Sequence, residues 1–304
     1  MSLMGTGKSP AMHELVLVAL LLGLSAAVWL VLLARRRAGQ AFVPYEARRP
    51  VPWGLLDVFL ALTLLVFLTS VALATLGDDI TCRPDEPLDP DAVSRQLTVI
   101  LAQALVSLVV VVVSVGTIWL RYRATGADLG WSAAKVRSDI WLGVIAFLAL
   151  APPVYAIQMC LVQWFESKHP LIELIRYNPQ PPLIAAVIVS AVAVAPLVEE
   201  YLFRGLLQGW LERLADGHDD PLVLILGRAD QAPSVAAPGA ARWPVAVSAF
   251  TFAILHVTHG PDWIPLFVLA LGLGYLYRQT HRLLPAIVVH GLLNACSLLV
   301  LLVS

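Results

Sequence analysis

The last third of the chain carries carboxylates, imidazoles and an amide inside segments that are otherwise strongly hydrophobic. They fall in three short groups, Glu199-Glu200-Tyr-Leu-Phe-Arg204, Phe252-Ala-Ile-Leu-His256 and His290-Gly-Leu-Leu-Asn294. Side chains of these types can activate a water molecule, bind a metal ion or stabilise an oxyanion. A charged residue at bilayer depth costs about 2.5–3.5 kcal/mol on insertion scales, so we interpret the glutamates as functional.

The first group predicts two different roles for its adjacent glutamates. Glu200 and Arg204 are four residues apart, with the acid before the base, so they share a helix face and are expected to form a structural ion pair. Glu199 points about 100° away from Glu200 on a helix and is left outside that pair. We therefore expect Glu199 to be the catalytic carboxylate.

The second and third groups can reach the same level of the membrane as the first. Glu199 lies about 22 Å from the basic end of its hydrophobic segment, and His256 lies about 21 Å from the start of the next one. His290 and Asn294 share a helix face at about 10 and 16 Å from the start of the last segment. We expect these four residues to converge in one site, with Phe252 packing beside it.

The remaining polar residues near the hydrophobic segments have simpler interpretations. Three further histidines at segment ends or in loops are expected to be solvated or structural: His218, His259 and His281. His259 is also an alternative accessory group, because it follows His256 by three residues. Asp57 is expected to face the membrane interface, while Gln103 and Gln158 are expected to make interhelical hydrogen bonds.

The composition is that of an integral membrane protein. Of the 304 residues, 59% are hydrophobic and 13% are charged, whereas a soluble domain has about 25% charged residues. Long apolar segments in a bilayer satisfy their backbone groups as helices, so the expected fold class is all-α. The net charge of −1 gives no basic excess, so nucleic acid is not expected as a partner, whereas membrane lipid is. A peptide or protein substrate is implied only by the resemblance described below.

Segments long enough to span a bilayer recur along the whole sequence. We predict about eight transmembrane helices: 13–34, 53–76, 97–120, 140–164, 182–214, 243–258, 263–278 and 283–303. The sixth and seventh are short for full spans. The prediction is a polytopic protein with its catalytic core in the four C-terminal helices, divided into an N-terminal transmembrane region (1–139, three spans) and a core region that carries the three polar groups (140–304).

The loops predict the orientation. Lys and Arg concentrate in every second loop, which by the positive-inside rule puts both termini outside. We therefore predict a multi-pass protein of a bacterial plasma membrane with a site accessible from the cytoplasmic side. The polar loop 215–242 is interpreted as a connector, and the short apolar stretch 171–175 as an interfacial helix.

In their order and spacing, the three groups resemble a known family of intramembrane proteases. The CPBP family, which includes the CAAX proteases and bacteriocin-processing Abi proteins, carries E-E-x-x-x-R, F-x-x-x-H and H-x-x-x-N, and the resemblance covers roughly 185–300. It implies an intramembrane endopeptidase acting on membrane-associated or prenylated substrates. It assigns the catalytic glutamate to Glu199 and the nucleophilic water to Glu199 and His256, with His290 and Asn294 at or beside the site.

Two mechanisms fit these residues. In one, His256, His290 and Glu199 hold a divalent metal ion such as zinc, which activates the water, and the resembled family is usually described as metal-dependent. In the other, the reaction is metal-independent: Glu199 is the general base, His256 orients the water, and His290 and Asn294 donate to the oxyanion. The sequence leaves both open.

Two other classes of function compete with proteolysis. A non-enzymatic immunity or scaffold protein would keep the fold while losing a catalytic residue, but all three groups are intact. An ion-coupled transporter would use buried carboxylates as ion sites along a pathway through both halves of the protein. Here the polar residues gather in the last four segments and no repeat is visible, which favours the enzyme.

Overall fold

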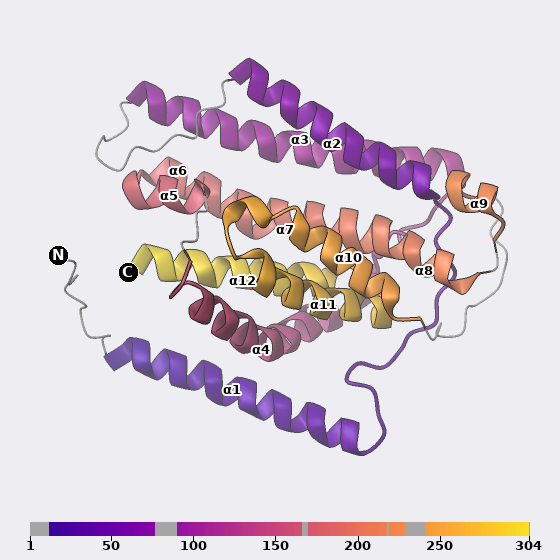
Figure 1. Ribbon diagram of the computed structural model, residues 1–304, viewed down its shortest axis with the longest axis horizontal. Coiled ribbons are helices and arrows are strands. Elements are labelled where there is room, and N and C mark those ends of the chain that lie inside the picture. The colour runs from indigo at the N-terminus through magenta and orange to yellow at the C-terminus, as the bar shows by residue number, and fades with distance from the viewer. Residues whose placement is uncertain (1–11, 77–89, 166–169, 218, 229–240, 304) are drawn as a thin grey trace.

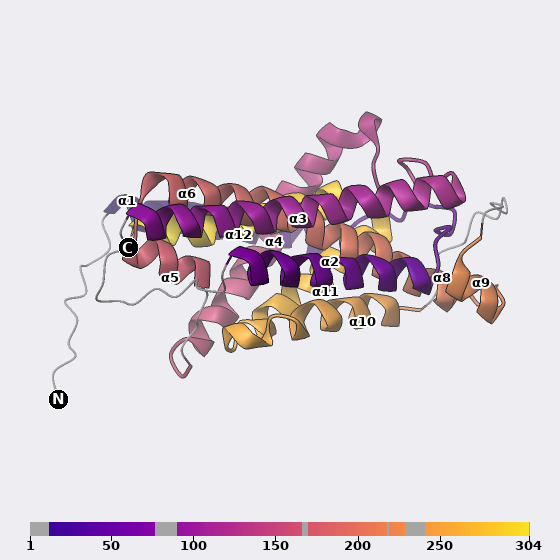
Figure 2. The same cartoon turned by 90° about the horizontal axis from the view of Figure 1, so that it is seen from above.

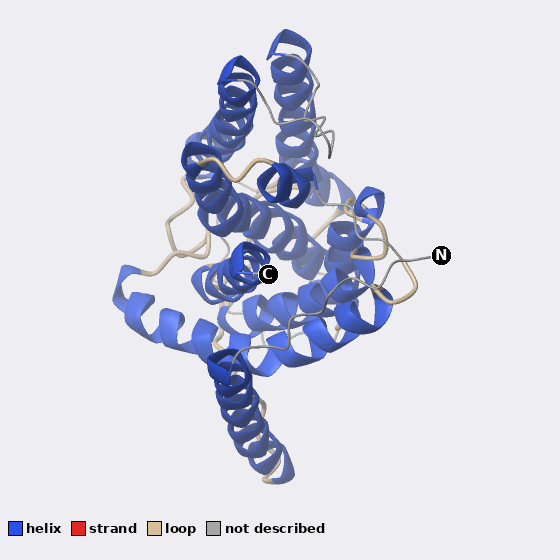
Figure 3. Cartoon of the chain, turned by 90° about the vertical axis from the view of Figure 1, so that its left-hand side faces the viewer, coloured by secondary structure: helices blue, strands red, loops and turns tan. Residues whose placement is uncertain are grey.

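The computed structural model describes residues 12–76, 90–165, 170–217, 219–228 and 241–303. Within these ranges the chain forms helices joined by loops and contains no strand, as Figure 3 shows. The longer helices are α1 (Met12–Arg37), α2 (Leu55–Leu76), α3 (Pro90–Tyr122), α4 (Val136–Leu161), α10 (Trp243–Ile254), α11 (Trp263–Thr280) and α12 (Leu284–Val303). The predicted all-α fold is confirmed.

The number of membrane spans differs from the sequence-based expectation. Among the described residues, 6 helices are long and apolar enough to cross a membrane. The 12 residues of α10 reach only about 18 Å, short of a hydrocarbon core of about 30 Å. The 18 residues of α11 reach about 27 Å, and this helix ends in Arg278-Gln-Thr280. A polytopic membrane fold is confirmed, but a count of eight full spans is not.

The fifth span is one continuous helix of 36 residues from Pro181 to Asp216. Along it follow α6 (Pro181–Ile188), the π-helical η2 (Val189–Val194), α7 (Ala195–Glu199), the π-helical η3 (Glu200–Gln208) and α8 (Gly209–Asp216). Pro196 has no N–H, so it cannot bond the Val192 carbonyl four residues earlier, and the wider π turn lies just before it. π segments are often found at functional sites.

Helix α12 packs directly on this irregular part of the fifth span. A Cβ atom on Gly291 would lie 2.8 Å from the Val192 carbonyl oxygen, so only glycine allows this approach. Three residues later, the Asn294 side chain donates to the Ala191 carbonyl at 2.7 Å. The backbone carbonyls of η2 are thus the surface on which α12 rests.

The bundle surrounds the fifth span and α12 (Figures 1 and 2). Helices α2 and α3 run side by side along one flank, and α4 packs against both α11 and α12 on another. Helix α1 contacts α4, where the Trp29 indole donates to the Ala149 carbonyl at 3.1 Å. Most of the outward surface of these helices is apolar, as expected for contact with lipid.

Two loops contain short helices. The predicted interfacial helix at 171–175 lies within α5 (Pro170–Tyr177), whose Leu174 and Ile175 are buried in a cluster with α3, α6 and α12. In the predicted connector 215–242 the chain forms α9 (Pro221–Leu226), while residues 218 and 229–240 of that loop lie outside the described residues. The predicted boundary between an N-terminal region (1–139) and a C-terminal core (140–304) stays a prediction.

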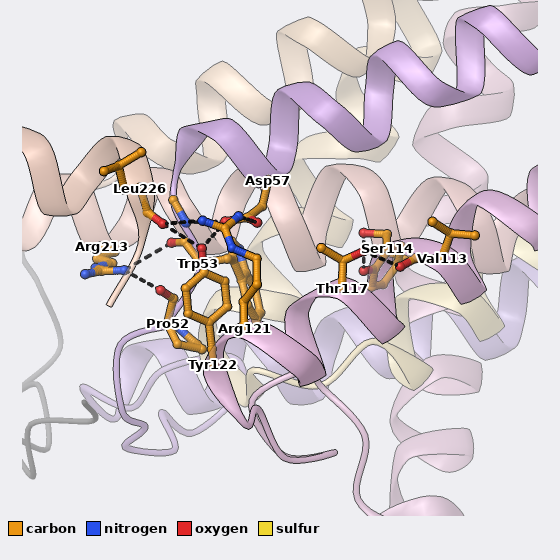
Figure 4. Close-up of polar contacts among 12 residues, drawn as sticks. Pro52, Trp53, Asp57, Val113, Ser114, Thr117, Arg121, Tyr122, Arg213 and Leu226 are labelled. Atoms are coloured by element: carbon orange, nitrogen blue, oxygen red, sulfur yellow. Dashed lines mark hydrogen bonds and ion pairs between the residues drawn. The ribbon is translucent and has the colours of Figure 1, made fainter. Parts of the chain in front are cut away.

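The Asp57 side chain does not face outward as expected, because it is buried within the protein near the start of α2. Its side chain is 2% exposed, accepts from the Gly54 amide at 2.9 Å and forms an ion pair with Arg121. The Tyr122 hydroxyl lies 2.6 Å from both Asp57 Oδ2 and the Leu226 carbonyl oxygen (Figure 4). Helix α9 covers this end of α2 and α3, which hydropathy alone does not reveal.

Candidate active site

The three sequence groups come together where the fifth span, α10 and α12 meet. Glu199 is the last residue of α7, and Glu200 begins η3. His290 of α12 reaches both glutamates: its Nδ1 lies 2.9 Å from Glu200 Oε1, and its Nε2 lies 3.7 Å from Glu199 Oε2. The ring of Phe252 contacts both imidazoles, with centroids 4.7 Å from His256 and 5.9 Å from His290.

Glu200 is fully buried in a network of charged and aromatic groups. Arg204 donates to Glu200 Oε1 at 2.9 Å, so the predicted ion pair is present, and the same oxygen contacts His290. The guanidinium lies 4.7 Å from the centroid of the Phe252 ring and donates to the Ala270 carbonyl at 3.4 Å. One carboxylate oxygen therefore connects the fifth span to α12, and its arginine partner reaches α10 and α11.

Glu199 has a different environment from its neighbour. Its side chain is 28% exposed, whereas that of Glu200 is 0% exposed. Its Oε2 faces His290 Nε2 at 3.7 Å, longer than a hydrogen bond. Of the two adjacent carboxylates, only Glu199 has an exposed surface.

His256 lies just after the end of α10, where its neighbours Leu255 and Val257 are exposed and the His256 side chain itself is half-buried. Its Nδ1 lies 2.8 Å from the carbonyl oxygen of Phe252, one turn earlier, which fixes the ring against its own helix. The chain then passes through the short 3-10 helix η4 (Val257–His259) and Gly260, whose φ of 92° favours glycine, before α11 begins. Irregular backbone at membrane depth occurs where protein or water covers it.

The structure does not place the Asn294 amide on the glutamates. Its Nδ2 donates to the Ala191 carbonyl of η2, so in this arrangement the side chain connects α12 to the fifth span. The sequence spacing puts Asn294 on the face of His290, and this part of the expectation agrees with the structure. The contact with Ala191 depends on the π-helical segment, which the sequence pattern did not predict.

The expected metal ligands do not form a ligand set. Among the described residues, no group of three His, Cys, Asp or Glu side chains could hold a metal ion. Each imidazole directs Nδ1 to an acceptor, His256 to a backbone carbonyl and His290 to Glu200, an arrangement that is compatible with metal binding through Nε2. A catalytic zinc ion takes three protein ligands at about 2.0–2.2 Å, and His256, His290 and Glu199 are not arranged to supply them here.

Of the three histidines expected to be solvated or structural, the structure describes the side chain of one. His281 is buried between the rings of Tyr45 and Tyr277, so it is structural and not solvated. Burial, together with the positive charges of Arg48, Arg278 and Arg282, lowers the pKa of His281 well below its ordinary value. His218 and the side chain of His259 lie outside the described residues.

Sequence reasoning missed two contacts of the site. The hydrogen bond between His290 and Glu200 joins residues 90 positions apart, and only the joint occurrence of their motifs hinted at it. The Gln158 side chain donates to Asp262 Oδ1 at 2.6 Å, which confirms the predicted interhelical hydrogen bond. What the sequence did not predict is the partner, which lies in the turn that follows His256. The interhelical hydrogen bond predicted for the Gln103 side chain stays a prediction.

Comparison with known proteins gives one match. Residues 181–296 match the family model described as type II CAAX prenyl endopeptidase Rce1-like. The matched range begins at the start of α6 and includes all three sequence groups. No curated protein matches the chain, and no solved structure does.

Proposed function

We propose that the chain is a membrane protease in which Glu199 and His256 activate the hydrolytic water, because residues 181–296 match the family model described as type II CAAX prenyl endopeptidase Rce1-like. The matched family agrees with the one predicted from the motifs. The assignment of chemical roles to residues is our own proposal, and it rests on the geometry of the two glutamates.

The observation that carries this proposal is the different environment of Glu199 and Glu200. A general base must be within hydrogen-bond reach of the water that it deprotonates. Glu199 is partly exposed, while Glu200 is enclosed by Arg204 and His290. Glu199 is therefore suited to act on water, and Glu200 is suited to hold Arg204 and His290 in place.

The proposed reaction is a direct hydrolysis. Glu199 takes a proton from a water molecule that His256 orients, and the resulting hydroxide attacks the peptide carbonyl carbon. The carbonyl oxygen becomes an oxyanion. In this scheme His290 is doubly protonated, so that Nδ1–H donates to Glu200 and Nε2–H donates to the oxyanion. When the C–N bond breaks, Glu199 returns the proton to the departing amine, so the carboxylate is regenerated.

We assign Asn294 a supporting role in this scheme. Its side-chain amide donates to the Ala191 carbonyl, which holds α12, and with it His290, against the fifth span. Direct donation from Asn294 to the oxyanion would require this bond to break. Replacing Asn294 should therefore change the placement of His290 before it changes the chemistry of the water.

Metal dependence is a separate proposal with its own test. We write no step through a metal ion, because the described donors are not grouped as a ligand set. A bound zinc ion would act as a Lewis acid and lower the pKa of its water. Under the glutamate scheme, exhaustive chelation of the purified protein leaves peptide cleavage unchanged; loss of cleavage that only zinc restores would instead support the metal scheme.

We propose membrane-associated, prenylated C-terminal peptides as the substrate class. The support is the matched family, described as CAAX prenyl endopeptidases, together with the position of the site inside an apolar bundle. A lipid-modified peptide partitions into the bilayer and can reach a carboxylate at this depth.

The direct test uses protein purified into nanodiscs and a farnesylated CAAX-type peptide with a fluorophore and quencher on either side of the cleavage site. We expect wild-type protein to release the C-terminal fragment and Glu199→Gln to lose about 10²- to 10⁴-fold in rate, the range of general base catalysis. Glu173→Gln on α5, outside the site, is the matched control and should keep wild-type activity.

The same assay separates the competing functions. Cleavage of the farnesylated peptide and of its unprenylated counterpart at equal rates would contradict the prenyl preference while supporting proteolysis. A folded wild-type protein that cleaves neither peptide nor any other membrane peptide offered would contradict the enzyme proposal and favour a non-enzymatic role.

A further inference from the structure

Helix α4 lies outside the matched range, yet it contacts both parts of the chain that carry the histidines of the site. Its residues Tyr155 and Gln158 are three apart and therefore share a helix face. Gln158 bonds the turn that follows His256, and Tyr155 bonds the helix that carries His290. One face of α4 thus contacts both the turn that follows His256 and the helix that carries His290.

The first contact holds the turn between α10 and α11. Gln158 Nε2 donates to Asp262 Oδ1 at 2.6 Å, a short bond to a carboxylate. Asp262 stands at the N-cap of α11, a position where aspartate commonly accepts from its own helix, but here its side chain makes no such bond. The carboxylate is turned toward α4 instead, six residues after His256.

The second contact holds α12 beside the site. The Tyr155 hydroxyl donates to the Leu293 carbonyl at 2.9 Å and lies 3.2 Å from the Ser297 hydroxyl. Leu293 directly precedes Asn294 and follows His290 by three residues. The tyrosine therefore fixes the turn of α12 that continues from the catalytic histidine.

Close packing makes α4 a firm support for these bonds. A Cβ on Gly143 would lie 2.6 Å from Val288 Cβ, and a Cβ on Gly272 would lie 2.6 Å from Leu150 Cδ1. At these two points α4 lies close to α12 and α11. A side chain at residue 143 would meet the Val288 Cβ atom and the Pro285 carbonyl oxygen, whereas one at residue 272 would meet the movable end of Leu150. Dense packing transmits a displacement and does not absorb it, so the two hydrogen bonds have a fixed base.

We propose that Tyr155 and Gln158 form a positioning clamp, here called the α4 clamp, which sets the placement of His256 relative to His290 for peptide hydrolysis. This inference rests on the proposed function. Neither residue touches the reacting atoms; they act through Asp262 and the Leu293 carbonyl. The α4 clamp would make a helix outside the matched range a part of the catalytic apparatus.

The kinetic test compares variants of the Gln158–Asp262 bond in nanodiscs with the farnesylated CAAX peptide. Gln158→Leu removes the donor and should lower kcat about 10- to 100-fold, because a misplacement of about 1 Å can cost about 100-fold. KM and the thermal midpoint should stay close to wild type. Met159→Leu changes the neighbouring residue, whose side chain is exposed on the outer surface, and should leave kcat unchanged.

A reversed bond gives a rescue that a purely structural loss would not show. Gln158→Glu places two carboxylates together and should also lower kcat. Adding Asp262→Asn to this variant lets the introduced amide donate to the introduced carboxylate, and we expect most of the lost kcat to return. A double variant no more active than Gln158→Glu would contradict the inference, as would unchanged kcat in Gln158→Leu.

Hydrogen–deuterium exchange tests the clamp without any proteolysis. In Gln158→Leu the backbone amides of 255–262 should exchange at least about 10-fold faster than in wild type, since their anchor on α4 is lost. Unchanged exchange in this segment would overturn the clamp. If wild-type protein cleaves no peptide, the proposed function fails, but this measurement still decides whether Gln158 anchors the turn.

Discussion

Two buried polar regions of this bundle are built in opposite ways. In the first, which we call the end cluster, Asp57, Arg121, Tyr122 and Arg213 tie the ends of α2, α3 and α8 to neighbouring loops (Figure 4). Both oxygens of Asp57 are bonded, and Arg213 Nη1 donates to the carbonyls of residues 51, 52 and 53 at 3.0–3.1 Å. The charged side chains of the end cluster are thus hydrogen-bonded to partners that the fold holds in place.

The second region, the group formed by Glu199, Glu200, Arg204 and His290, is less fully bonded. Glu200 Oε2 and Arg204 Nε are buried and have no hydrogen-bond partner, and Glu199 is partly exposed. Buried polar groups are usually bonded, and exceptions are common at functional sites. The difference indicates that the end cluster stabilises the fold, whereas the second region retains bonding capacity for chemistry.

The largest effect on stability is expected from breaking the buried pair in the second region. Arg204→Met removes the cation beside Glu200 and leaves an uncompensated buried carboxylate, which should lower the free energy of unfolding by about 3–5 kcal/mol. Thermal unfolding in detergent checks this. A loss below about 1 kcal/mol would show that Glu200 does not depend on Arg204.

A smaller effect is expected in the end cluster. Asp57→Asn weakens the bonds to Arg121 and Tyr122 and should cost about 1.5–3 kcal/mol of unfolding free energy, typical of hydrogen bonds to charged groups. Peptide cleavage per folded molecule should stay at the wild-type level, because this region does not touch the site. Asp91→Asn, at the exposed start of α3, serves as the control. A fall in cleavage without a fall in stability would contradict the division between the two regions.

The smallest effect concerns pH and the buried His281. Its pKa is lowered in the folded protein by burial and by Arg48, Arg278 and Arg282. A backbone hydrogen bond with Glu46 acts in the opposite direction, and the Glu212 carboxylate faces the ring at 3.9 Å. The unfolded state then binds the extra proton, so stability is complete above about pH 6.5 and is lost as the pH falls below it.

The loss attributable to His281 approaches about 1.4 kcal/mol for each pH unit below about 6.5. His281→Asn removes the titration and suits the positive φ of 52° at this position. We expect its thermal midpoint to fall less than that of wild type between about pH 7 and about pH 5. Equal slopes for the two proteins would show that His281 does not contribute.

The residues of the candidate site could be proposed from the sequence because their types and spacing carry information. The costs of burying Glu199 and Glu200, together with the ordered groups around His256 and His290, predicted a shared site, and helix lengths put them at matching depth. Counted from the end of its own helix, His290 was predicted at a shallower level than Glu199. The two residues still meet, because the fifth span continues through α8 to Asp216, beyond the start of α12.

The remaining features depend on contacts that no local pattern encodes. The covering of Asp57 by α9, the bond from His290 to Glu200 and the support of Asn294 by Ala191 all join distant parts of the chain. Hydropathy predicted a span at 243–258, but it does not reveal that α10 stops at Ile254 and turns through η4. Irregular segments of this kind are set by packing around the site.

The most direct test of the account replaces each adjacent glutamate separately in otherwise identical preparations. We predict that Glu199→Gln loses cleavage of the farnesylated peptide by about 10²- to 10⁴-fold while its thermal midpoint stays near wild type. Glu200→Gln should lower the midpoint, because it weakens the bonds to Arg204 and His290. Cleavage at the wild-type rate by Glu199→Gln would contradict the assignment of Glu199 as the general base.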